Sequence, residues 1–162
     1  MAATVTWYDY TSTNGATETA TTNANFLSID AHDTGTSYQT NKISVPPTGT
    51  TYSFERIIRA KWTDTYNTID TVKFWKSGGT PPTNVSINAA ESATATTPTD
   101  SASSVATSAV PETEGAALSI TTSGSSPNVV TYYIYLQLVV PSTVTTPGDI
   151  ATQTYTLKYF ES

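Results

Sequence analysis

The chain has no cysteine among its 162 residues. Disulfides and thiolate metal sites are therefore excluded, and stability has to come from a packed core. Charged residues are also scarce, at 12% of the chain, which is about half of the usual share in a soluble domain. Thr and Ser fill the gap, a composition typical of exposed β-proteins such as adhesins, fibres, coat proteins and surface layers.

The chain also lacks long hydrophobic runs. The longest, residues 132–140, has the length of a strand, well short of the roughly 20 residues that cross a membrane as a helix. The first residues, MAATVTWYDY, have neither the basic nor the apolar region of a signal peptide. We therefore expect either a protein made and assembled in the cytoplasm or a mature chain with an added Met, and in both cases no membrane partner.

Positive charge is limited, with 7 Lys and Arg against 13 Asp and Glu and a formal net charge of −6. This argues against general nucleic-acid binding, which needs a basic surface. The cations are unevenly placed, however, since most fall between Tyr52 and Lys76. A local basic patch favours contact with an acidic partner, although a solvated face is the commoner explanation. The candidate partner contacts are Arg56, Arg59, Lys61, Lys73 and Lys76.

The same stretch, Tyr52 to Lys76, predicts a β-hairpin with TDTYNT as its turn. In the first arm one face carries Phe54, Ile58, Ala60 and Trp62, and the other carries Glu55, Arg59 and Lys61. In the second arm Val72 and Phe74 share one face, and the other face carries Ile69, Lys73 and Trp75. The first arm also fits a helical period through Phe54, Ile57, Ile58 and Lys61. We favour the strand, because its residue types prefer strands and no helix stop follows.

Further strands are predicted at 3–10, 39–45, 85–88, 132–140 and 152–161, with a polar loop and an Asn14-Gly15 turn after the first. Large apolar side chains on both faces of 132–140 indicate a central strand. Pro147-Gly148-Asp149 supplies the turn before the last strand, whose inward residues are Tyr155, Leu157 and Tyr159. About seven to nine short strands predict an all-β fold, an antiparallel β-sandwich of Ig-like or jelly-roll-like type.

We expect residues 1–162 to form one β-sandwich domain with a loop-rich insertion at about 77–128. The segment ESATATTPTDSASSVATSAVPETEG within it is low in complexity and rich in Ala, Ser and Thr. It has too few large apolar residues to fold alone. As an ordered loop region it would have to lie against its own sandwich or against a neighbouring copy.

The only histidine, His32, lies between Asp30 and Asp33. This arrangement suits a divalent ion, or a histidine base held by a carboxylate. It equally suits a surface turn in which Asp caps its own backbone, and we favour the turn because the cluster supplies at most three metal ligands. The chain has no G-x-S-x-G, GxGxxG, P-loop or HExxH motif. No catalytic, cofactor or metal residue is predicted, and the protein is not expected to be an enzyme.

The aromatic residues allow two interpretations. Flat rings on a Thr-rich sandwich suit a sugar-binding platform, and Tyr8, Tyr10, Tyr133 and Tyr135 are the candidates for exposed positions. Alternating Tyr and Trp also pack cores and sheet faces. Packing is the simpler account of Trp62, Trp75, Tyr155 and Tyr159, and we prefer it for the whole set.

Three segments carry a resemblance to a known group: SFERIIRAKW (53–62), IDTVKFWKSG (69–78) and YYIYLQLVVPSTVTTPGDIATQTYTLKYFE (132–161). Together they resemble small β-sandwich virion proteins of tailed bacteriophages, of the head decoration or auxiliary capsid type. The resemblance implies a non-enzymatic protein that binds the assembled shell and stabilises it. Its expected partners are the major capsid protein or other virion subunits, and its expected place is the capsid surface.

Such a protein would be a homo-oligomer or occupy its lattice in many copies, gaining affinity through multivalency. Two alternatives remain open. A glycan- or receptor-binding module of a phage tail or fibre predicts exposed Trp or Tyr lining a groove. A self-assembling surface or filament protein predicts exposed, unpaired strand edges.

Overall fold

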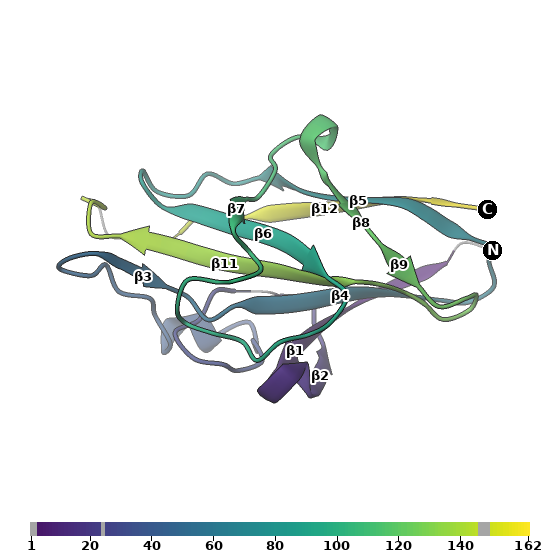
Figure 1. Cartoon of the computed structure of the whole chain (residues 1–162), viewed down its shortest axis with the longest axis horizontal. Helices are drawn as coiled ribbons and strands as arrows, with labels where there is room; N and C mark the ends of the chain where they lie inside the picture. The colour runs from purple at the N-terminus through teal and green to yellow at the C-terminus, as the bar shows by residue number, and fades with distance from the viewer. Residues whose placement is uncertain (1–2, 24, 146–149) are drawn as a thin grey trace.

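The computed structural model describes residues 3–23, 25–145 and 150–162. Within these residues the chain forms twelve strands and three short 3₁₀ turns, η1 (Thr13–Gly15), η2 (Ser37–Gln39) and η3 (Glu114–Ala116). Every strand pairing is antiparallel, and the strands form two sheets in separate layers (Figure 1). The predicted all-β antiparallel sandwich is confirmed.

The larger layer, which we call the large sheet, has the order β2-β1-β4-β11-β6-β7. These strands are β2 (Thr17–Ala20), β1 (Thr4–Thr11), β4 (Arg56–Thr63), β11 (Tyr133–Pro141), β6 (Ser86–Ser92) and β7 (Ser108–Ala109). Three short strands attach to it, namely β3 (Thr50–Tyr52) on β11, β10 (Val129–Thr131) on β4, and β9 (Thr122–Ser123) on β10. The other layer, the small sheet, has the order β12 (Thr154–Glu161), β5 (Ile69–Gly78) and β8 (Leu118–Ile120).

The main core lies between the two sheets and follows the period-two alternation of their strands. β11 lies between β4 and β6, as predicted for a central strand, and its inward residues Ile134, Leu136 and Leu138 are buried. Trp62 of β4 is fully buried and meets Tyr159 of β12 edge to face, with ring centroids 5.2 Å apart. Aromatic contacts between the layers therefore hold the sandwich together.

The predicted hairpin of residues 52–76 is wrong, although both of its strands exist. β4 pairs with β1 and β11, whereas β5 pairs with β12 and β8, so the two arms belong to different sheets. Each arm has a large apolar face, and these faces meet across the core instead of lying side by side. The link buries Tyr66, whose hydroxyl accepts a hydrogen bond from the Val129 amide at 3.0 Å. It is an arch between layers.

Three further predictions need correction. Ile69 was expected to share a face with Lys73, but it is buried because Thr71, at φ 50°, interrupts the alternation of β5. Residues 39–45 form no strand, whereas residues 17–20 of the predicted loop form β2, after a turn at the predicted Asn14-Gly15. The predicted turn at Pro147-Gly148-Asp149 lies outside the described residues.

The Ala/Ser/Thr-rich residues 93–107 contain no strand and lie against the outer face of the large sheet. The buried Gln137 side chain of β11 binds them, donating to the carbonyls of Thr99 and Ser101 at 3.2 and 2.8 Å and accepting from the Ser103 amide at 2.9 Å. Ala106 packs in a second buried cluster with Tyr10, Ile57 and Tyr135. These contacts are made with the segment's own sandwich.

No helix among the described residues is long and apolar enough to span a membrane.

Candidate interaction surface

The five candidate cations occupy four separate places. Arg56 and Lys76 are only 2% and 6% exposed. Arg59 and Lys61 lie on the outer face of the large sheet, whereas Lys73 lies on the outer face of the small sheet. The cations therefore do not form one basic patch, and the two buried ones are not available to a partner's surface.

Arg56 belongs to an internal ion pair at one end of the sandwich. Its Nη2 lies 2.5 Å from Oδ2 of the buried Asp9, and its Nη1 donates to the Ala31 carbonyl at 2.7 Å. His32 Nδ1 contacts the same carboxylate oxygen at 3.1 Å. These contacts fasten the loop around Ala31 to β1 and β4, so Arg56 has a structural role.

The two aspartates around His32 accept hydrogen bonds from backbone amides. Asp33 accepts the Gly35 amide at 2.8 Å and the Asn25 amide at 3.0 Å, and Asp30 accepts the Ser12 amide at 2.8 Å. The Asp33 contact with the Gly35 amide is the backbone cap that the interpretation as a turn predicts. Asp33 itself is buried, and the carboxylate that contacts His32 is Asp9. Across the described part of the chain, no group of three or more His, Cys, Asp and Glu is placed to hold a metal ion.

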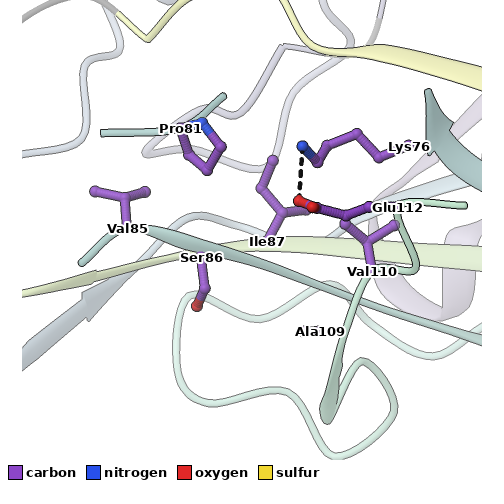
Figure 2. A pocket seen from close by; sticks show the side chains of 8 residues that line it. All are labelled: Lys76, Pro81, Val85, Ser86, Ile87, Ala109, Val110 and Glu112. Atoms are coloured by element: carbon purple, nitrogen blue, oxygen red, sulfur yellow. Dashed lines mark ion pairs between the residues drawn. The ribbon is translucent and has the colours of Figure 1, made fainter. Parts of the chain in front are cut away.

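Lys76 lines a small hollow between the layers. Its Nζ lies 2.9 Å from Glu112 Oε1, the pair that Figure 2 marks, and donates to the Gly79 carbonyl at 2.7 Å. Apolar side chains, including Val85, Ile87 and Val110, form the remaining walls (Figure 2). The hollow measures about 120 Å³, below the roughly 300–1,000 Å³ of small-molecule sites. The charge of the buried Lys76 is therefore satisfied locally, by its ion pair with Glu112.

The outer face of the large sheet brings aromatic and charged residues together on four strands. We call this set the tyrosine–cation face; it consists of Tyr8, Tyr10, Glu18, Arg59, Lys61 and Tyr133. Alternation points these β1 and β4 residues away from the main core between the sheets. Tyr10 is nevertheless buried, because it packs in the second cluster with Ala106. The register then places Tyr8 opposite Arg59, and Tyr10 opposite Glu18.

Each cation of this face lies over a tyrosine ring. The Arg59 guanidinium carbon is 4.3 Å from the Tyr133 ring centre, and Lys61 Nζ is 4.3 Å from the Tyr8 ring centre. Tyr10 and Tyr133 meet edge to face at 5.1 Å. Arg59 Nε also donates to the Thr131 carbonyl at 2.6 Å. Stacking and this hydrogen bond fix the direction of the guanidinium.

Glu18 links the two halves of the face. It accepts a hydrogen bond from the Tyr10 hydroxyl and pairs with Lys61 Nζ at 2.6 Å. Burial and the Glu18 carboxylate raise the pKa of the Tyr10 hydroxyl, which therefore stays protonated as a donor. Burial opposes ionisation of Glu18, but hydrogen bonds from Lys61 and Tyr10 outweigh it and lower the pKa of Glu18.

Arg59 keeps free bonding capacity. Its terminal Nη nitrogens make no hydrogen bond or ion pair with any described residue, whereas Lys61 is already paired with Glu18. An oriented guanidinium with open donors suits a carboxylate, which accepts two parallel hydrogen bonds. The outward placement predicted for Arg59 and Lys61 is confirmed, and their contact with a partner stays a prediction.

The sequence pointed to some of this face and missed the rest. The candidates for exposed positions were Tyr8, Tyr10, Tyr133 and Tyr135, but Tyr10 and Tyr135 are buried. Nothing in the sequence brought these tyrosines to the cations or identified Glu18. The missing information was the register between strands distant in the chain. For Arg56 a signal was available, because alternation puts it on the same side as Ile58 and Ala60.

The small sheet presents a second charged face. Lys73 lies directly opposite Lys158, and Lys158 Nζ pairs with Glu114 at 2.5 Å. That hydrogen bond lowers the pKa of the Glu114 carboxyl. Trp75 lies opposite Thr156, and Phe160 is 58% exposed.

Comparison with protein-family models, with curated proteins and with solved structures finds no match to this chain.

Proposed function

We propose that the protein is a non-enzymatic structural component of a virion, a capsid decoration or auxiliary head protein that binds the assembled shell. The observation that carries this proposal is the Arg59 guanidinium, held over Tyr133 with its terminal nitrogens open on a rigid sheet. Its partner is an acidic, carboxylate-bearing surface of the major capsid protein or of another virion subunit. The resemblance of the three segments to phage virion proteins supplies the biological setting.

The surface is suited to a shallow, repeated contact. The donors lie on a sheet face instead of in a cleft, so each copy gains modest affinity, and a lattice multiplies it. Sheet residues are held in place before binding, which reduces the entropy lost on association. Net negative charge elsewhere on the chain leaves this face as a local site for an acidic partner.

The same geometry disfavours a sugar platform. Lys61 lies over the Tyr8 ring and Arg59 over the Tyr133 ring. A pyranose stacks on the ring faces that these cations already use. The most exposed large apolar residues, Ile29, Tyr38 and Phe160, lie on different segments of the chain. The virion structural role is therefore preferred over a glycan-binding module.

The contact set is smaller than the sequence predicted. Arg59 and Lys61 are retained as partner contacts. Arg56 and Lys76 are left out because both side chains are buried and already paired, Arg56 with the buried Asp9 and Lys76 with the exposed Glu112. Lys73 belongs to the other face of the sandwich, so it would contact the shell only if the small sheet faced it.

The test mixes purified protein with undecorated shells of the virus that encodes it and measures the bound fraction by co-sedimentation. Reversing both charges, Arg59→Glu with Lys61→Glu, is expected to weaken binding by roughly tenfold or more, since each 1.4 kcal/mol is a factor of ten. The matched control is Lys42→Glu with Lys73→Glu, which changes net charge equally but leaves the tyrosine–cation face intact.

Full occupancy of the control and loss by the Arg59/Lys61 variant support the proposal. Equal occupancy of both variants removes the tyrosine–cation face from the interface. Loss only in the control assigns the contact to Lys42 or Lys73 instead. A thermal melt of each variant verifies that the sandwich is folded before binding is compared.

A further inference from the structure

β12 is the outermost strand of the small sheet. One of its sides pairs with β5 along Thr154–Glu161. On its other side, no backbone hydrogen bond reaches any described residue. A strand edge of this kind presents unpaired N–H and C=O groups, and it is a template for a strand from another molecule.

The edge is longer and more regular than the other sheet edges of the described chain. The other edge strands are short, with 4 residues in β2, 2 in β7 and 3 in β8, whereas β12 has 8. The pairing irregularities between β12 and β5 place their additional residues in β5, at Ser77 and near Thr71, so β12 itself runs without a bulge. Its one Lys, Lys158, is paired with Glu114. β12 contains no proline.

We propose that β12 pairs antiparallel with β12 of a second copy across a two-fold axis, with Leu157 opposite Leu157 of that copy. In an antiparallel pair, directly opposite side chains point to the same face of the sheet, whereas neighbouring residues of one strand point to opposite faces. A residue of β12 can therefore lie opposite itself or a residue an even number of positions away, so the two-fold axis passes through a residue and not between two residues. An axis at Lys158 sets the two lysines against each other, which is unfavourable. An axis at Thr156 or Tyr159 shortens the paired segment. The axis at Leu157 avoids both problems.

This register also matches the side chains. On the inner face, Tyr155 lies opposite Tyr159 of the second copy, and both are only partly buried in the single chain. On the outer face, Thr156 lies opposite Lys158 of the second copy, and Thr154 lies opposite the exposed Phe160. Aromatic pairs and Thr–Lys neighbours are favourable or neutral across antiparallel strands. The strand therefore complements itself.

Two-fold pairing uses the same edge on both copies, so it closes at a dimer and does not grow into a filament. The two small sheets become one continuous sheet. The tyrosine–cation face belongs to the large sheet and takes no part in the contact. The dimer is therefore independent of the proposed shell contact, and each idea is able to fail alone.

The test places charge at Thr156, which faces Lys158 of the second copy twice in each dimer. Thr156→Lys is expected to raise the dimer dissociation constant by about 2- to 30-fold, and Thr156→Glu is expected to lower it by a similar factor. Thr154→Lys adds the same charge to the same face of β12 but opposite Phe160, so it serves as the matched control. Sedimentation equilibrium measures each constant, and circular dichroism verifies folding.

A dimer that weakens with Thr156→Lys, strengthens with Thr156→Glu and is unchanged by Thr154→Lys supports the proposal. A wild-type chain that stays monomeric up to about 1 mM overturns it. A dimer that responds to neither Thr156 variant also overturns it, because its contact then lies elsewhere. Open-ended polymers overturn the two-fold geometry.

Discussion

Two cation–carboxylate clusters share strand β4, and they differ mainly in burial. Arg56 pairs with Asp9, and these side chains are 2% and 1% exposed. Lys61, five residues further along and beside Arg59, pairs with Glu18, and those side chains are 28% and 37% exposed. The first cluster lies inside one end of the sandwich, and the second lies on the outer face of the large sheet.

The difference in burial separates an internal ion pair, Asp9–Arg56, from exposed cations that we propose as partner contacts. A buried charge without its counter-charge is costly, so the Asp9–Arg56 pair is fixed in the folded state. An exposed ion pair contributes little to stability, so the groups around it are free to exchange partners. Cations that look equivalent in the sequence therefore differ in burial and in what they are free to contact.

The largest effect is expected from Asp9→Asn, which leaves the Arg56 charge buried and unpaired. The free energy of unfolding should fall by about 3–5 kcal/mol, measured by urea denaturation. Asp9→Asn combined with Arg56→Met removes both charges and should cost less than Asp9→Asn alone. A loss below about 1 kcal/mol for the single variant would show that the pair is not structural.

A smaller effect on stability, with a clear effect on binding, is expected from Arg59→Lys. Lysine keeps the charge but loses the planar fork that stacks on Tyr133 and offers parallel donors. The thermal midpoint should change little, and occupancy on undecorated shells should fall. Wild-type occupancy for this variant would mean that only charge matters at this position.

Glu18→Gln should reduce stability at neutral pH by about 0.2–1 kcal/mol, because its ion pair is partly exposed. The lowered pKa of Glu18 gives this contribution a pH window. It is present above the pKa of the unfolded chain and is lost as pH falls through the lower folded pKa. Denaturation curves of wild type and variant should converge in acid. A gap that persists there would contradict the assigned role.

The opposite pH trend is expected from Glu55. Burial raises the pKa of this carboxyl despite hydrogen bonds from Ser103 and the Thr99 amide. The folded protein binds a proton at Glu55 more tightly than the unfolded chain does. The contribution of Glu55 to stability is therefore complete below its unfolded pKa and is lost as pH rises through its folded pKa. Glu55→Gln should remove this decline from the stability–pH profile. An unchanged profile would show that Glu55 does not titrate with folding.

Local pattern located the long strands, β1, β4, β5, β6, β11 and β12, but it missed the short ones and failed on strand partners. Alternation placed Ile134, Leu136 and Leu138 on one face of β11 and Arg59 and Lys61 on the outside of β4. It did not say that β4 and β5 belong to different layers, because an arch and a hairpin use the same alternating arms. The Thr71 irregularity, which turns Ile69 inward, also leaves no clear signal in the residue types.

The candidate site is formed by residues far apart in the chain, and local alternation does not say which distant strands pair. Tyr133 reaches Arg59 only through the pairing of β11 with β4, and Asp9 reaches Arg56 only through the pairing of β1 with β4. His32 meets Asp9 through a loop rather than through its sequence neighbours. Sequence alone therefore supplied the chemical groups, and the topology determined which of them meet.

The most direct test of the central claim is a cryo-electron microscopy map of decorated shells that fixes the orientation of the sandwich. We expect the tyrosine–cation face of the large sheet to lie against the shell, with an acidic side chain of the shell at the Arg59 guanidinium. A map in which the small sheet lies against the shell, with Arg59 and Lys61 facing solvent, would contradict it.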